Sequence, residues 1–147
     1  MRLGLAFLAG ALASALLAPA ALAAPQVTGQ FNLPDKPGYL TQGPDGNIWV
    51  AYGSKVVSRV TPAGAGTNFT LDTITQVGGI TAANGKLWTT GNNEIGSFSP
   101  GDPVGTDATF PVTGVSGQAQ IARGSDGNLW TGGADTVFKV SQADLRH

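Results

Sequence analysis

The sequence of 147 residues contains no cysteine, which excludes disulfides, thiol chemistry and cysteine-ligated zinc or iron–sulfur centres. Its only histidine is His147, the final residue, in a position where chain ends commonly fray. Beyond residue 23 no helical periodicity is found, and 22 glycines punctuate short apolar segments along the chain. These features indicate an all-β protein that is stabilised by packed strands alone.

The sequence also lacks an excess of positive charge. Residues 24–147 carry seven Lys and Arg against nine Asp and Glu, a formal charge of −2. Nucleic acids and anionic membranes favour proteins with a basic patch, so neither is expected as a partner. No second apolar run follows the first one, so we expect no membrane association after removal of the N-terminal segment.

The N-terminal segment has the layout of a secretory signal. Arg2 precedes an apolar run from Leu3 to Leu17, and the small-residue pattern Ala21-Leu22-Ala23 follows a proline. This pattern predicts a signal peptide over residues 1–23, with cleavage after Ala23. The mature chain, residues 24–147, would form one domain in an extracytoplasmic location, either secreted or periplasmic.

One short phrase occurs three times in the mature chain. The copies are Asp45-Gly46-Asn47-Ile48-Trp49, Asn84-Gly85-Lys86-Leu87-Trp88 and Asp126-Gly127-Asn128-Leu129-Trp130. The tryptophans are 39 and 42 residues apart, close to the repeat of roughly 40–45 residues in four-stranded β-propeller blades. The glycines at 46, 85 and 127 suit tight hairpin turns, and the regular tryptophans suit packing between blades.

The other residues follow the same repeat. Apolar residues at 40, 80 and 121 mark an innermost strand, and alternating segments at 56–60, 95–98 and 136–140 mark a third strand. We therefore predict three four-stranded antiparallel blades, over about 38–71, 78–112 and 118–141. Residues 30–33 are predicted to form an outer strand of the kind that propellers pair with their last blade.

Three blades raise a physical problem, because closed propellers typically have 4–8 blades. An open arc would leave two apolar blade faces in water. Two chains could pair about a two-fold axis as a homodimer that closes a six-bladed ring. Alternatively, the chain is a fragment of a longer protein that supplies the missing blades. Both alternatives remain open at this point.

The run from Leu40 to Trp49, followed by Val57-Ser58-Arg59-Val60-Thr61-Pro62-Ala63-Gly64, resembles the blade repeat of the virginiamycin B lyase family, also called streptogramin lyases. Gly79-Ile80-Thr81 and residues 95–100 continue the resemblance in the second repeat, and residues 124–130 continue it in the third. The resemblance implies part of a seven-bladed propeller. It also implies a Mg²⁺-dependent elimination that opens a cyclic depsipeptide, with a base drawn from His and Glu residues.

The catalytic pattern of that family does not carry over to this chain. The glutamate that commonly stands three residues after the tryptophan in the family repeat is replaced by Tyr52, Gly91 and Gly133. No Glu-x-His pair is present, and His147 is terminal. We therefore assign no catalytic residue. Magnesium is expected only if the lyase interpretation holds, and no other cofactor is predicted.

Ligand-binding candidates remain on the loops between second and third strands, which gather on one face of a propeller. They are Tyr52, Lys55, Asn92, Asn93, Glu94 and Asp135. Two of them, Glu94 and Asp135, form the one pair of carboxylates worth testing as a cation site, because hard cations favour oxygen ligands.

Two functional hypotheses follow. The first is a secreted, non-catalytic propeller segment that binds a ligand or a protein through its loop face, or a fragment of such a protein. The second is a lyase-like enzyme whose active site is complete only when further blades close the ring.

Overall fold

A computed structural model describes residues 24–143 and Leu145. The predicted signal peptide, residues 1–23, and His147 lie outside the described residues. The described part is all-β, as predicted, and contains no helix. Residues 24–143 therefore contain no helix that is long and apolar enough to span a bilayer.

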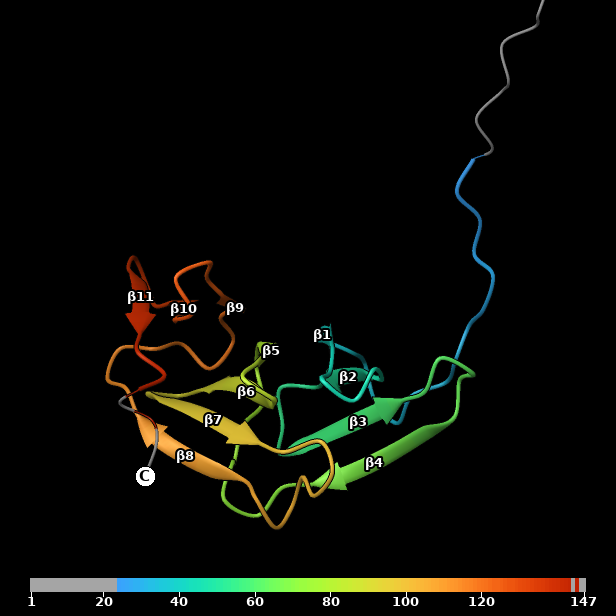
Figure 1. Ribbon diagram of the computed structural model, residues 1–147, viewed down its shortest axis with the longest axis horizontal. Coiled ribbons are helices and arrows are strands. Elements are labelled where there is room, and N and C mark those ends of the chain that lie inside the picture. Colours follow the sequence, from blue (N-terminus) through green and yellow to red (C-terminus); the bar gives the residue numbers. More distant parts are fainter. Residues whose placement is uncertain (1–23, 144, 146–147) are drawn as a thin grey trace, which may run out of the picture.

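Three antiparallel sheets follow one another along the chain and form an open arc (Figure 1). Blade 1 comprises β1 (Tyr39–Gln42), β2 (Ile48–Ala51), β3 (Val56–Val60) and β4 (Gly66–Thr70). Blade 2 comprises β5 (Ile80–Ala83), β6 (Lys86–Gly91), β7 (Glu94–Phe98) and β8 (Ala108–Pro111). Blade 3 comprises β9 (Ile121–Arg123), β10 (Leu129–Gly132) and β11 (Val137–Val140). Blade 3 thus has three strands in the described residues, and its fourth strand was expected from residues 30–33.

The repeated phrase forms the turn between the first and second strands of each blade. Gly46 and Gly127 have φ angles of 78° and 79°, in the left-handed region that glycine adopts without strain. In both of these turns an aspartate carboxylate accepts a hydrogen bond from the following tryptophan. Asp45 Oδ1 lies 3.0 Å from Trp49 Nε1, and Asp126 Oδ1 lies 3.2 Å from Trp130 Nε1. The phrase therefore fixes a turn and orients an indole ring.

The core lies between the blades rather than within any one sheet. Between blades 1 and 2, the fully buried Trp49 packs against Phe69 and Phe98, with ring centroids 5.6 and 5.5 Å away. Between blades 2 and 3, Trp88 packs near Phe110 in a second buried cluster. Each blade thus needs the next one to cover its tryptophan face.

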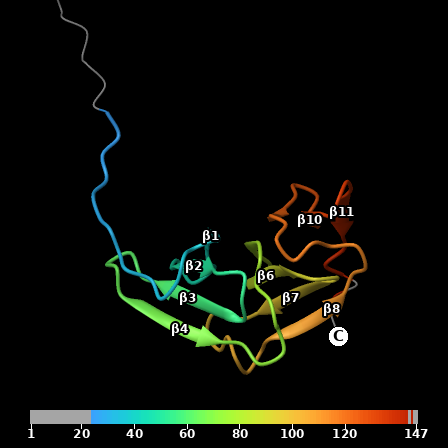
Figure 2. The same ribbon diagram turned by 180° about the vertical axis from the view of Figure 1, so that it is seen from behind.

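The predicted outer strand over residues 30–33 is not formed, because these residues are irregular in the structure. An outer strand needs the free edge of a third strand, and β4 already occupies the edge of β3. The free edge of β11 lies at the opposite end of the arc from the N-terminal segment (Figures 1 and 2). Within one chain the expected partner is therefore out of reach.

One carboxylate ties the linker between blades 1 and 2 to the start of β8. Asp107 Oδ2 accepts hydrogen bonds from the backbone nitrogens of Thr73, at 2.6 Å, and Ile74, at 3.2 Å. We expect Asp107→Ala to lower the free energy of unfolding by about 1–3 kcal/mol, because the partly buried amide of Ile74 and the exposed amide of Thr73 both lose their acceptor. Urea unfolding followed by circular dichroism measures this, with Asp72→Ala as the matched control on an exposed carboxylate. Equal effects of the two changes would contradict the assignment.

Candidate functional site

The candidate residues of the first loop differ in how free their side chains are. The Tyr52 hydroxyl donates to Ser58 Oγ at 2.7 Å, and Ser58 in turn donates to Asn68 Oδ1 at 2.6 Å. This chain of bonds runs across β3 and β4 and draws the Tyr52 hydroxyl onto the sheet. Lys55 is exposed, and its backbone carbonyl accepts from Leu71 N at 2.9 Å. Of these two residues, only Lys55 offers a free polar side chain.

Asn92 and Asn93 hold the linker between blades 2 and 3 against the loop. Asn92 Oδ1 accepts from Gly117 N at 3.2 Å, and Asn93 Oδ1 accepts from Gly114 N at 2.8 Å. Asn93 also has a φ angle of 56°, which asparagine tolerates better than most residues. Both asparagines therefore have a structural role, and each keeps an amide NH₂ group for other contacts.

The two candidate carboxylates differ in environment. Asp135 is exposed and accepts from Thr136 Oγ1 at 3.1 Å, whereas Glu94 is half-buried. Glu94 Oε1 is buried and has no hydrogen-bond partner in the described residues, and burial raises the pKa of this carboxyl. Residues 24–143 contain no group of three or more His, Asp or Glu side chains that could hold a metal ion. This donor set does not fit a magnesium site, so we derive no step through the metal.

The raised pKa of Glu94 predicts a pH dependence of stability. The folded state binds the proton of the Glu94 carboxyl more tightly than the unfolded chain does. Ionised Glu94 therefore lowers the stability of the fold as pH rises above the pKa of the unfolded chain, and the loss is complete above the pKa of the folded state. Glu94→Gln should therefore raise the melting temperature at pH 7 and leave it unchanged well below pH 4.5, the ordinary value for this group. Thermal unfolding across this range, with Asp135→Asn as an exposed control, measures the effect. A lower melting temperature at pH 7 would refute it.

Beside Asn92, three polar side chains that the sequence does not single out lie on β1 and on the linkers between blades. The Tyr39 hydroxyl donates to the Gln118 carbonyl oxygen at 3.2 Å and so joins β1 to the linker that enters blade 3. A methyl group on Gly117 would collide with Gln76 Oε1 and lie 2.8 Å from Asn92 Oδ1, so both side chains cover this glycine. We call Tyr39, Gln76, Asn92 and Gln118 the linker cluster. No repeat motif marks Gln76 or Gln118, because the linkers connect the repeated units.

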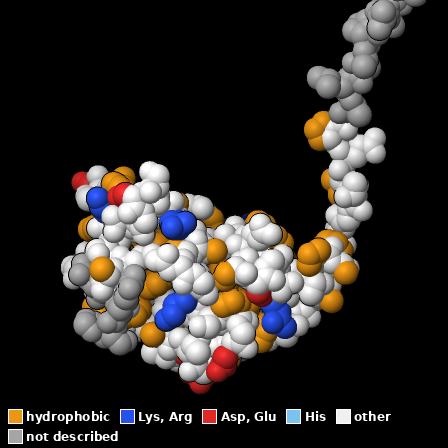
Figure 3. Space-filling model, in the orientation of Figure 1, with side chains coloured by type: hydrophobic (Ala, Val, Ile, Leu, Met, Phe, Trp, Pro, Cys, Tyr) orange, Lys and Arg blue, Asp and Glu red, His pale blue; other side chains and the backbone are white. Residues whose placement is uncertain are grey.

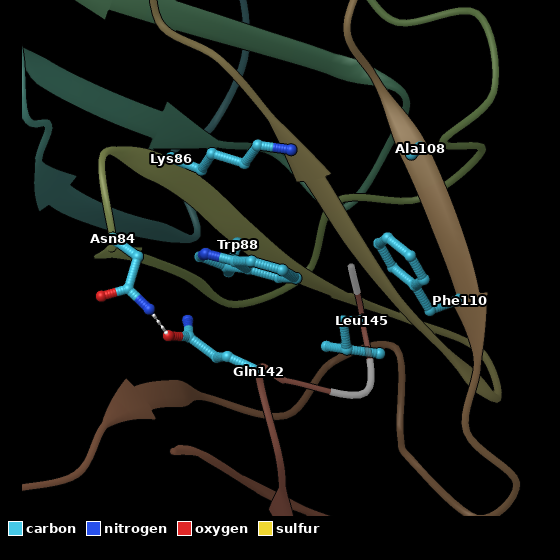
Figure 4. A pocket seen from close by; sticks show the side chains of 7 residues that line it. All are labelled: Asn84, Lys86, Trp88, Ala108, Phe110, Gln142 and Leu145. Carbon is cyan, nitrogen blue, oxygen red and sulfur yellow. Dashed lines mark hydrogen bonds between the residues drawn. The ribbon is translucent and has the colours of Figure 1, made fainter. Parts of the chain in front are cut away.

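A cavity of about 570 Å³ opens between blades 2 and 3 on another part of the molecule (Figure 4). Trp88 and Phe110 form its apolar wall, and Leu145 faces them. Asn84 donates a hydrogen bond to Gln142 at its rim, where Lys86 also lies. Gln142 and Leu145, which follow β11, line the cavity opposite blade 2, and none of the six loop candidates lines it.

Comparisons with known proteins place the fold. No protein-family model matches the sequence, and no curated protein matches it. The structure is similar to a catalytically inactive virginiamycin B lyase from Staphylococcus aureus crystallised with quinupristin, with a TM-score of 0.62 and 24% identity. It is also similar to the extracellular domain of a putative hybrid two-component system from B. thetaiotaomicron, with a TM-score of 0.58 and 16% identity.

Both similarities are partial. The first alignment covers 76% of this chain but 41% of the lyase, and the second covers 75% of this chain but 16% of the extracellular domain. The chain thus spans less than half the length of either protein. Together with the three consecutive sheets, the similarities show that the chain folds as part of a β-propeller.

Proposed function

We propose that the chain is part of an exported β-propeller that binds an amide-rich ligand or a protein through its loop face without catalysing a reaction. The observation that carries this proposal is the linker cluster. Its side chains are three amides and one phenol, all of which donate and accept hydrogen bonds. A face of this composition suits recognition of peptide groups better than acid–base catalysis.

Export is the second part of the proposal. It is supported by the signal pattern of residues 1–23 and by the similarity to an extracellular domain. Expression of the full gene product in a bacterial host, followed by N-terminal sequencing of the extracytoplasmic fraction, tests it. We expect the mature protein to begin at Ala24, and recovery of the uncleaved chain from the cytoplasm would contradict export.

Quinupristin is a suitable first probe of the loop face, because the similar lyase was crystallised with it. We expect the side-chain amide NMR signals of Gln118 and Asn92 to shift on titration, while mass spectrometry finds no ring-opened product in the presence of Mg²⁺. Gln118→Ala should reduce the shift of the Asn92 signal on titration with quinupristin. Gln120 is an exposed glutamine nearby, so Gln120→Ala is the matched control. Unchanged spectra at saturating quinupristin would contradict binding of this ligand class.

The alternative is a lyase-like activity that appears only when further blades complete the ring. The similarity to a lyase, of which this chain covers 41%, favours considering it. Ring-opened quinupristin formed by the mature chain would overturn the non-catalytic proposal.

A further inference from the structure

The interface between blades 1 and 2 shows what each blade requires of its neighbour. Trp49 of β2 lies between Phe69, from the outer strand of its own blade, and Phe98 of the next blade. Phe69 and Leu71 both belong to this cluster, so the outer strand and the residue that follows it help to cover the next blade. The tryptophan, an outer-strand phenylalanine and the next blade form one packing unit.

Blade 3 has the equivalent tryptophan, but in the described residues it lacks the outer-strand phenylalanine and the next blade. Trp130 is 37% exposed, whereas Trp49 and Trp88 are 0% and 4% exposed. Lys139 packs over the Trp130 ring at 5.6 Å, and Val137 on the adjacent strand is 71% exposed. In the described residues no strand pairs with the outer edge of β11, although β4 and β8 occupy that edge in the other two blades. Blade 3 thus exposes both an aromatic face and a free strand edge.

Blade 1 presents the complementary half of the unit at the other end of the arc. Phe31 and Leu33 lie over its outer face and enclose a hollow of about 320 Å³ with Leu40, Val50 and Val60. Val60 occupies the strand position that Phe98 has in blade 2, because each pairs with the residue before the repeat tryptophan. The N-terminal segment therefore covers blade 1 as Phe69 and Leu71 cover blade 2. Figure 3 shows hydrophobic side chains where this segment meets the body of the molecule.

We propose that residues 30–33 of one chain form the missing outer strand of blade 3 in a second copy of the chain. In this arrangement Trp130 of the second copy enters the hollow between Phe31 and Val60, as Trp49 enters between Phe69 and Phe98. The open face of blade 1 in one copy is then covered by the open face of blade 3 in the other copy. This inference concerns assembly and does not depend on the proposed ligand.

The repeat fixes the register of the exchanged strand. Val57 pairs with Phe69 in blade 1, and Ile95 pairs with Phe110 in blade 2. Val137 is the corresponding residue of blade 3, because it pairs with Gly132, two residues after the tryptophan, as Val57 pairs with Ala51. Phe31 should therefore pair with Val137 of the second copy, and Asn32 should pair with its neighbour Thr136.

Two such exchanges close the assembly. In the part of the chain that the structure describes, each copy has one open tryptophan face and one open N-terminal face. A two-fold axis pairs the four open faces of two copies at once. The resulting ring would contain six blades, within the usual range for closed propellers. It would also remove the free edge of β11, which otherwise invites uncontrolled pairing.

The absence of cysteine makes disulfide trapping a direct test. Directly opposed residues on antiparallel strands have side chains close enough for a disulfide. The mature variants Asn32→Cys and Thr136→Cys, both at exposed positions, are mixed under mild oxidation and analysed by non-reducing electrophoresis. Thr113→Cys, also exposed, replaces Thr136→Cys in the matched control. Circular dichroism first establishes that each variant is folded.

We expect the Asn32–Thr136 mixture to give a cross-linked dimer at least ten times faster than the Asn32–Thr113 mixture. Phe31→Ala in the Asn32→Cys chain should remove most of this difference. Equal cross-linking rates for the two mixtures would overturn the exchange. A chain that carries both Asn32→Cys and Thr136→Cys and forms its disulfide only within one chain would also overturn it. A folded mature chain that remains monomeric at high micromolar concentration would overturn it as well.

Discussion

Replacing Trp49 by alanine is expected to lower the free energy of unfolding by about 3–5 kcal/mol, the usual cost of removing a large buried aromatic side chain. Trp49 is fully buried and contacts aromatic rings from β4 and β7, so its loss would leave a cavity at the centre of the interface between blades 1 and 2. The Asp45 carboxylate would also lose its indole partner. Urea unfolding followed by far-ultraviolet circular dichroism measures the change.

The repeat supplies a matched control for this prediction. Trp130→Ala removes the equivalent side chain where it is 37% exposed, so in dilute, monomeric protein its cost should be well below that of Trp49→Ala. At concentrations that favour the dimer, the same change should weaken association. Equal destabilisation of the monomer by both substitutions would contradict the packing described between blades 1 and 2.

Gly78→Ala is expected to destabilise the fold by about 3 kcal/mol, at the upper end of the usual cost of overpacking. A methyl group at Gly78 would overlap the carbonyl oxygen of Gly117 and lie 2.7 Å from its carbonyl carbon. These atoms belong to the backbone, so no change of side-chain rotamer can relieve the collision. The two linkers that join the blades would have to separate.

Gly66→Ala is the control for this second substitution. Gly66 lies in the exposed strand β4, and a methyl group there would meet no atom within 4 Å. Its effect should stay within about 0.5 kcal/mol, as for most surface changes. If Gly78→Ala unfolded at the same urea concentration as Gly66→Ala, the close approach of the two linkers would be wrong.

The blades could be predicted from the sequence because their information is local. The Asp-Gly and Asn-Gly turns and the alternation of the neighbouring strands all lie within one repeat. The exposure of Trp130 could not be predicted in this way, since it depends on what covers blade 3. The irregular conformation of residues 30–33 has the same cause, because their sequence suits an outer strand but one chain offers no edge within reach.

The loop face shows a similar limit. Sequence identifies Tyr52, Asn92 and Asn93 as polar loop residues, but it cannot show that their side chains bind the sheet and the linkers. Sequence offers Asn92 but not the rest of the linker cluster, because Tyr39 and Gln118 are 79 residues apart and meet only when the blades assemble. Contacts of this kind arise from the curvature of the arc, which no single repeat encodes.

The solution mass of residues 24–147, measured by light scattering after size exclusion, tests most directly whether the two open ends of the arc pair with each other. The account predicts a discrete species with twice the mass of one chain, which Trp130→Ala shifts toward the monomer. A folded monomer at every concentration, or aggregates without a discrete dimer, would contradict ring closure by two chains and point to blades supplied by a longer protein.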